Sequence, residues 1–194
     1  MPPLVSVITP TWQRHEWLLN RCIPSVQAQD WPAVEHVVVS DGPDPELAAA
    51  IIGQVEEFDQ LPDHDPAAKF GTRPRLRGLE LATGDLIAYL DDDDAYRPHH
   101  CTVLAGALTA RPDAAFAYSL MSVEGAIVGA DPPVFCGIGT PIIMHRSETP
   151  GRFGTWGPDG PAEDWDLVER WLAAGATYVY VPDVTVDVWP SAYR

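Results

Sequence analysis

Basic residues are scarce in this chain of 194 residues. It holds 12 Lys and Arg against 28 Asp and Glu, which gives a formal net charge of −16. Nucleic-acid binding normally draws on a basic patch that releases counterions from the phosphates. The excess of acidic over basic residues therefore argues against a nucleic-acid partner. A phosphorylated small molecule can still bind where a metal ion or a few arginines reverse the charge locally.

Cysteine is also rare, and long apolar runs are missing. Cys22, Cys101 and Cys136 are widely spaced, odd in number and without a C-x-x-C pair, so the sequence indicates neither a zinc site nor a disulfide framework. So few and unpaired cysteines favour a reducing compartment, and we expect a cytoplasmic protein. The start lacks a charged leader with an apolar core, and no segment approaches the ~20 apolar residues that span a bilayer. We therefore expect a soluble protein without a transmembrane segment.

The pattern of apolar residues alternates between strands and helices. Apolar, β-branched runs predict buried strands at 4–9, 35–40, 85–90 and 114–122, with Pro10 ending the first. Helical spacing predicts helices at 16–29, around 47–52, up to Ala82 before Gly84, and at 98–110. Such alternation predicts an α/β fold with a mainly parallel central sheet flanked by helices, and ligands outside the carboxyl ends of the strands.

The last third of the chain has a different character. Residues 131–161 are rich in Pro and Gly around a short apolar stretch at 141–144, which predicts loops carrying one short strand. A helix is predicted at 163–174 and a closing strand at 178–181. No clean domain boundary is visible, so we expect residues 1–194 to form a single domain.

Four consecutive aspartates, Asp91 to Asp94, follow the predicted strand at 85–90. Like charges packed this closely disfavour the ionised forms unless a cation or solvent compensates them. A hard divalent ion with oxygen ligands is the natural compensator. The alternative is a solvated acidic turn that caps the helix after it, and the run alone does not decide between the two.

Four blocks of the sequence, taken together and in this order, resemble family 2 glycosyltransferases with the GT-A fold. They read VSVITPTW (5–12), VVSDG (38–42), ATGDLIAYLDDDD (82–94) and EDWDL (163–167). The resemblance implies an inverting enzyme, dependent on Mn²⁺ or Mg²⁺, that moves a sugar from a nucleoside diphosphate sugar to a hydroxyl group of a glycan, lipid or small-molecule acceptor. It also implies that residues 1–98 form the donor half and residues 99–194 the acceptor half.

The same resemblance implies the residues that bind the nucleotide. Pro10 and Trp12 match the nucleotide-binding turn, where the Trp12 ring can cover a base. The alternative for Trp12 is a core residue that anchors the next helix. Asp41 matches the carboxylate that recognises the base or ribose, and it can accept an imide N–H or a hydroxyl proton. Its alternative role is to cap the turn at Gly42.

The aspartate run matches the family's D-x-D motif. The resemblance implies Asp93 as the direct metal ligand, with Asp91 or Asp92 directed to the ribose or to metal-bound water. Two of the four side chains are expected to face the ligand, because successive side chains alternate in extended chain. Arg75 falls where the family carries a phosphate-binding arginine. Its surroundings depart from the family pattern, so a surface helix with solvated charges is a comparable alternative.

The last block supplies the predicted catalytic residue. Asp164 matches the family's general base, which takes the proton of the acceptor hydroxyl, and Glu163 is its acidic neighbour. The alternative is a favourable pairing of both carboxylates with a helix N-terminus. Trp165 and Trp156 can pack against a sugar ring, whereas His145 is more simply a satisfied buried histidine.

Two other functions agree with parts of the sequence. One is a nucleotidyltransferase, which also uses metal-binding carboxylates but usually needs a glycine-rich and basic loop early in the chain. The other is a non-catalytic module that binds a sugar nucleotide on the same fold, against which Asp164 argues. Exposed tryptophans would make a homodimer plausible.

Overall fold

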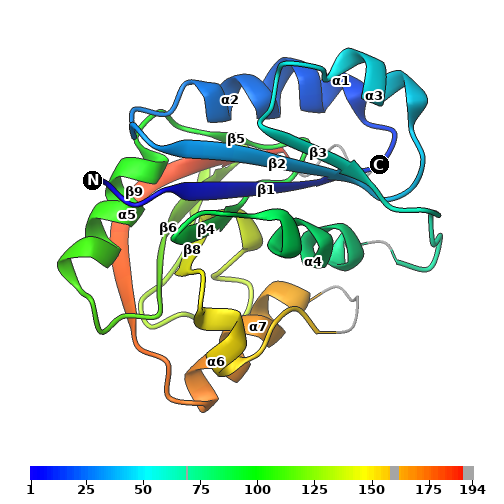
Figure 1. Ribbon diagram of the computed structural model, residues 1–194. Coiled ribbons are helices and arrows are strands. Elements are labelled where there is room, and N and C mark those ends of the chain that lie inside the picture. Colours follow the sequence, from blue (N-terminus) through cyan, green and yellow to red (C-terminus); the bar gives the residue numbers. More distant parts are fainter. Residues whose placement is uncertain (69, 158–161, 190–194) are drawn as a thin grey trace.

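The computed structural model describes residues 1–68, 70–157 and 162–189. These residues form a nine-stranded sheet with helices on both faces (Figure 1). The strand order is β3-β2-β1-β4-β8-β6-β9-β5, and β7 pairs with β6 at one side of this path. The predicted α/β class is confirmed.

The first half of the sheet is parallel. Its strands are β1 (Val5–Thr11), β2 (Val34–Ser40), β3 (Glu57–Gln60) and β4 (Leu86–Tyr89), with β1 between β2 and β4. Every residue of β1 and β4 is buried, as expected for strands covered on both faces. The short helix α3 (Pro45–Ala50) lies on the same face as α1 and α2, and α4 (Thr72–Leu81) lies on the other (Figure 1).

Strand β1 runs one residue past Pro10, where the sequence predicted its end. The pairing of β1 with β4 extends to Ile8 and Tyr89, and Leu90 N–H donates to Ile8 O. The next donor toward β4 would be Pro10, which has no N–H, and there the chain after Leu90 turns away into the aspartate run. On its other edge β1 continues to pair with β2 up to Thr11 and Ser40. Proline is tolerated because only one edge is still paired.

The helix predicted at 16–29 is a chain of three helical segments. These are α1 (His15–Trp17), a π-helical turn η1 (Leu18–Cys22) and α2 (Ile23–Gln27). Pro24 lies in the first turn of α2 and cannot donate to the carbonyl four residues earlier. A widened π turn before it accommodates this missing hydrogen bond.

The second half of the sheet is mixed. Its strands are β5 (Ala95–Tyr96), β6 (Phe116–Val123), β7 (Ala126–Val128), β8 (Ile143–Arg146) and β9 (Tyr178–Val188). β8 runs antiparallel to both β4 and β6, while β9 is parallel to β6. The expectation of a mainly parallel sheet therefore holds for the first four strands, and the reversal begins at β8.

Three helices and a 3₁₀ turn complete this half. They are α5 (His100–Ala110), η2 (Thr140–Ile142), α6 (Thr149–Phe153) and α7 (Glu163–Ala173). In Figure 1, α6 and α7 lie below the sheet, on the same side as α4. Trp171 of α7 packs edge-on against His145 of β8, so α7 is anchored to the reversed strand. Among the described residues, no helix is both long and apolar enough to cross a membrane.

Candidate functional site

The carboxyl ends of β1, β2 and β4 open into one cavity of about 640 Å³. Thr11, Asp41 and Asp91 line it from the ends of these strands, and the first turn of α7 contributes Glu163 and Asp164. The volume is in the range of small-molecule sites. The fold therefore brings together carboxylates that are more than one hundred residues apart in sequence.

One end of the cavity is a flat aromatic pair. The rings of Trp12 and His64 stack with centroids 4.2 Å apart and planes 7° apart. His64 Nδ1 lies 3.0 Å from Asp41 Oδ2, and a guanidinium nitrogen of Arg73 lies 3.8 Å from Asp41 Oδ1. Burial raises the pKa of Asp41, and these two partners oppose the rise. The predicted residues Pro10, Trp12 and Asp41 all line this end.

The aspartate run is a turn, so its side chains do not alternate as extended chain would require. The Asp94 N–H donates to Asp91 O at 3.1 Å, which closes the turn. Three carboxylates line the cavity, those of Asp91, Asp92 and Asp94, where two were expected. The expectation failed because it assumed that the strand geometry continued past Leu90.

Arg14 holds two members of the run. One of its guanidinium nitrogens lies 3.1 Å from Asp92 Oδ1 and 2.8 Å from Asp93 Oδ2. Asp92 also accepts a hydrogen bond from the Thr11 hydroxyl at 2.7 Å. Asp93 is 1% exposed and is not among the residues that line the cavity. Its predicted metal contact therefore requires Arg14 to share or release the Asp93 carboxylate, whereas Asp91 and Asp92 already face the cavity.

The run carries more negative charge than its protein partners neutralise. Burial, reinforced by the adjacent aspartates, raises the pKa of Asp92 to about 7 and raises the pKa of Asp94. Within the described residues, no three His, Cys, Asp or Glu side chains form a group that could hold a metal ion. Mg²⁺ is usually bound by one or two carboxylates together with substrate phosphates. The donor set fits a divalent cation whose shell is completed by a diphosphate.

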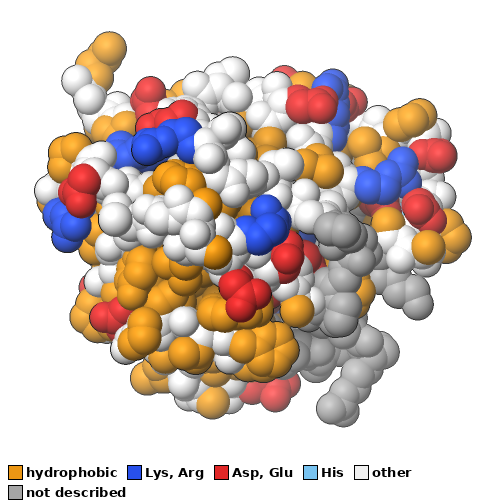
Figure 2. Space-filling model, turned by 90° about the horizontal axis from the view of Figure 1, so that it is seen from below, with side chains coloured by type: hydrophobic (Ala, Val, Ile, Leu, Met, Phe, Trp, Pro, Cys, Tyr) orange, Lys and Arg blue, Asp and Glu red, His pale blue; other side chains and the backbone are white. Residues whose placement is uncertain are grey.

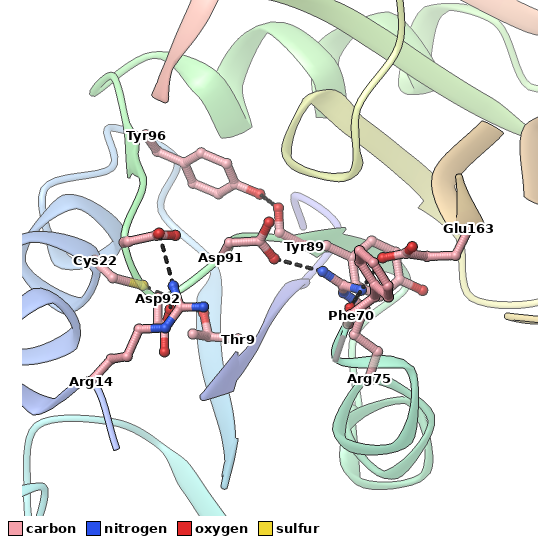
Figure 3. Close-up of polar contacts among 11 residues, drawn as sticks. Thr9, Arg14, Cys22, Phe70, Arg75, Tyr89, Asp91, Asp92, Tyr96 and Glu163 are labelled. Carbon is pink, nitrogen blue, oxygen red and sulfur yellow. Dashed lines mark hydrogen bonds and ion pairs between the residues drawn. The ribbon is translucent and has the colours of Figure 1, made fainter. Parts of the chain in front are cut away.

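Arg75 connects the two sides of the cavity. Its guanidinium lies 2.6 Å from Asp91 Oδ1 and 3.1 Å from Glu163 Oε1, and it also donates to the Phe70 carbonyl (Figure 3). The ring of Trp156 lies 5.1 Å from the guanidinium carbon. Arg75 is buried, which excludes the alternative of a solvated surface charge. It lies where a cation can face both a diphosphate and the first turn of α7.

The first turn of α7 presents two carboxylates with different neighbours. Asp164 lines the cavity, and one of its oxygens accepts the Trp165 N–H at 2.7 Å. Burial raises the pKa of Asp164. Burial also raises the pKa of Glu163 to about 7, against the opposing effect of Arg75. Glu163 thus forms an ion pair with Arg75, whereas the contact described for the Asp164 carboxylate is with the Trp165 N–H.

Three other predicted candidates lie outside the cavity lining. Trp165 is half-buried against the core, so the structure does not bring it to the site as predicted. Trp156 is buried edge-on against Tyr89, with ring centroids 5.1 Å apart. His145 is buried and pairs with the Tyr89 hydroxyl at 2.9 Å, which agrees with its interpretation as a satisfied core histidine.

Two residues at the site were missed from the sequence. Arg14 lies two residues after the first block, and a cation so close to a strand end in so acidic a chain was an available signal. His64 lies in a polar loop with prolines on either side, and nothing in its neighbours indicates that it reaches Trp12. Only the fold reveals its position.

The described arginines of the surface have acidic neighbours. On the face drawn in Figure 2, the described basic side chains lie in separate small groups, most of them beside acidic ones. Arg77, for example, pairs with Asp59 and Glu80 at 2.6 and 2.7 Å. Such pairs leave little positive potential for a polyanion.

Comparison with known families identifies the fold and the donor-side blocks. Residues 6–134 match the family model described as glycosyl transferase family 2. Apart from Val5, this range contains the first three of the four blocks named above, and it contains strands β2 to β7 whole. The resemblance inferred from the sequence is therefore confirmed.

Curated relatives are similar over about half of this chain. A glucosyl-dolichyl phosphate glucuronosyltransferase of Haloferax volcanii is 31% identical over 125 residues, which cover 64% of this chain and 37% of that protein. A GalNAc(5)-diNAcBac-PP-undecaprenol beta-1,3-glucosyltransferase of Campylobacter jejuni is 30% identical over 110 residues, 55% of this chain and 33% of that protein. The matches span only 9% to 37% of the length of the curated relatives.

Solved structures extend the similarity to nearly the whole chain. Residues 1–349 of S. aureus TarS in complex with UDP-GlcNAc superpose with a TM-score of 0.78 and 18% identity, covering 96% of this chain and 58% of that one. The mannosyltransferase PcManGT from Pyrobaculum calidifontis, in complex with GDP-Man and Mn²⁺, gives 0.71 and 16%, covering 97% and 57%. At this identity the likeness establishes the fold, which is of the GT-A type.

Proposed function

This chain belongs to glycosyl transferase family 2, and on that premise we propose that it transfers a sugar from a nucleoside diphosphate sugar to a hydroxyl group of an acceptor. One observation carries the proposal. The cavity collects an aromatic ring beside a carboxylate, an aspartate run that Arg75 joins to the first turn of α7, and a second pair of carboxylates on that turn. These are the groups that a base, a diphosphate and an attacking hydroxyl require.

The donor class is supported by the proteins that share the fold. TarS was crystallised with UDP-GlcNAc, and PcManGT with GDP-Man and Mn²⁺. In the present chain, the base would stack on Trp12 and donate an N–H to Asp41, while Arg75 would face the diphosphate. This assignment is independent of the base and the sugar, because several bases can stack on an indole ring and donate an N–H to a carboxylate.

We propose that the reaction depends on Mg²⁺ or Mn²⁺. Asp93, with Asp91 or Asp92, would hold the cation, and the cation would stabilise the negative charge that develops on the leaving nucleoside diphosphate. Arg14 would then be shared between Asp92 and Asp93.

Asp164 is the proposed general base. It lines the cavity from the first turn of α7, and partial burial raises the pKa of its carboxylate, so it binds a proton more readily than an exposed aspartate. It would take the hydroxyl proton as the acceptor oxygen attacks the anomeric carbon. Attack from the side opposite the diphosphate inverts the configuration at that carbon. Glu163 would stay bound to Arg75 and orient the turn.

We also propose a cytoplasmic location. Cys22, Cys101 and Cys136 are all free thiols in the structure, as they would be in a reducing compartment. The buried thiols of Cys22 and Cys101 pack in the core rather than facing the cavity.

A donor panel tests the function directly. UDP-, GDP-, CDP- and ADP-linked sugars should be screened by thermal shift with Mn²⁺, since a ligand that binds the folded state raises its apparent stability. We expect stabilisation by donors of at least one base, and a smaller shift after Mn²⁺ is removed with a chelator. A melting temperature that no donor raises would contradict the proposal.

A further inference from the structure

His64 already makes the two contacts that the proposed function assigns to the donor base. Its ring stacks on Trp12, with centroids 4.2 Å apart and planes 7° apart. Its Nδ1 lies 3.0 Å from Asp41 Oδ2. A flat ring on the indole and a ring nitrogen at the carboxylate are the interactions by which a nucleobase would be held.

The stacked pair leaves no space for a third ring between its members. A centroid separation of 4.2 Å with nearly parallel planes is already contact distance. Gly42 packs against the Trp12 ring and the base of the His64 side chain: a Cβ there would lie 2.8 Å from the Trp12 ring and 2.9 Å from His64 Cβ. A base can reach this face of Trp12 only if the imidazole moves away.

His64 is placed so that it can move without unravelling its loop. It lies between β3 and α4, and its side chain is 27% exposed. The neighbouring residues are held by bonds that do not involve the imidazole. Asp63 pairs with Arg73 at 2.6 Å, and Asp65 Oδ1 accepts the Ala67 N–H at 2.9 Å. Rotation of the His64 side chain breaks only its own contacts.

We propose that His64 is an internal surrogate for the donor base, which must displace it to bind. The inference rests on the proposed function and deepens it, because it names a residue that sets specificity at the base end of the cavity. A base binds well when it both stacks on Trp12 and donates to Asp41 better than the imidazole does. After displacement, Arg73 still faces Asp41, and Asp41 Oδ1, which has no hydrogen-bond partner within the described residues, remains available to the base.

Calorimetric titration of UDP and GDP in the presence of Mn²⁺ tests the displacement. The apparent affinity of a site that is open only part of the time is reduced by that fraction, so His64→Ala should bind the preferred nucleotide roughly tenfold more tightly than wild type. His99→Ala is the matched control, because His99 lies outside the cavity lining, and its affinity should equal that of wild type. Weaker or unchanged binding by His64→Ala would overturn the inference and indicate that the base uses Asp41 Oδ1 with His64 in place.

Two further measurements separate this inference from the function on which it rests. Inorganic pyrophosphate has no base and should bind wild type and His64→Ala equally; an equal gain for pyrophosphate would overturn the surrogate role. In NMR spectra of wild type, the His64 ring protons should lose their ring-current shift when the nucleotide is added, and an unchanged shift would contradict displacement. If UDP or GDP binds wild type without a gain in His64→Ala, only this inference fails. If none of UDP, GDP, CDP and ADP binds wild type or His64→Ala, the proposed function fails with it.

Discussion

Residues 1–98 and residues 99–194, the proposed donor and acceptor halves, build their shares of the cavity in different ways. In residues 1–98, Thr11, Asp41 and Asp91 lie at or just past the carboxyl ends of parallel strands, so the regular sheet alone brings them to one edge. In residues 99–194, the contributing groups come from the first turn of α7, from a 3₁₀ turn with the glycine before it, and from single residues of β6 and β9. The donor side is thus set by strand order, and the acceptor side by loops and one helix.

This difference suits the two halves to two kinds of ligand. A nucleotide is the same rigid object in many reactions, and strand ends hold its contacts at fixed spacings. Acceptors vary, and loops can vary with them at little cost to the fold. Arg75 is the one described residue that ion-pairs with both the aspartate run and α7, so its guanidinium links the two halves electrostatically.

The largest expected effect comes from removing the proposed base on the acceptor side. Asp164→Asn should lower turnover by roughly 10²- to 10⁴-fold, the usual contribution of a positioned base, while donor affinity stays within a few-fold. Steady-state kinetics and calorimetry measure the two quantities. Asp166→Asn is the matched control, because Asp166 lies in the same turn but pairs with Arg170. Comparable turnover by Asp164→Asn and wild type would remove the assignment and favour a binding module.

The second effect tests the connection between the halves. Arg75→Ala leaves Asp91 and Glu163 without their shared cation, and breaking such a buried pair typically costs about 3–5 kcal/mol of folding free energy. Urea denaturation measures the loss. Arg77→Ala on the same helix is the control, because Arg77 is 39% exposed and surface pairs contribute at most about 1 kcal/mol. Equal losses for the two variants would mean that the halves are not joined through Arg75.

The third effect concerns the metal on the donor side. Asp93→Asn should weaken Mn²⁺-dependent nucleotide binding by at least about tenfold, as changes around a metal ligand usually do. Titrations with and without Mn²⁺ measure it, and Asp113→Asn, an exposed aspartate paired with Arg111, is the control. Because Arg14 ion-pairs with Asp93 in the structure, Asp91→Asn and Asp92→Asn should be titrated in the same way. Loss in these two but not in Asp93→Asn would move the metal contact to the carboxylates that line the cavity.

The smallest effect is a pH dependence of stability on the acceptor side. Burial raises the pKa of Glu163 to about 7, above the ordinary value of 4.5. A raised carboxyl pKa stabilises the fold at low pH, and that stability is lost as the pH rises through 7. Glu163→Gln should therefore lose less stability than wild type between pH 5 and 8, by on the order of 1 kcal/mol. Thermal melts across this range measure it, with the exposed Glu169→Gln as control; parallel curves for Glu163→Gln and wild type would refute the shift.

Much of the donor half could be predicted from the sequence because its signals are local. Runs such as Val37 to Val39 are buried on both faces, and their burial fixes both strand and register. The end of a helix just before Gly84 was predicted correctly, but Gly84 does not act as a helix cap with positive φ. A Cβ at Gly84 would lie 2.5 Å from Ser6 Oγ and 2.8 Å from Leu4 O, so glycine is needed there for close approach to β1.

What the sequence could not supply depends on contacts between distant segments. β3 is a polar edge strand whose residues lack the apolar alternation that marks a strand. The turn at Asp91 to Asp94, the stacking of His64 on Trp12 and the burial of Arg75 each require a partner from another block. The alternation of strands and helices, together with the family resemblance, predicted which blocks meet, but not which side chain of each block faces the cavity.

The central claim is that this cavity activates a nucleoside diphosphate sugar for attack by a hydroxyl group. Release of nucleoside diphosphate from the donor that stabilises the protein most, with water as the attacking hydroxyl, tests it without knowledge of the acceptor. The account predicts Mn²⁺-dependent release by wild type, and release by Asp164→Asn that is lower by roughly 10²-fold or more although the donor still binds. Donor binding with equal release by wild type, Asp164→Asn and a protein-free control would contradict it.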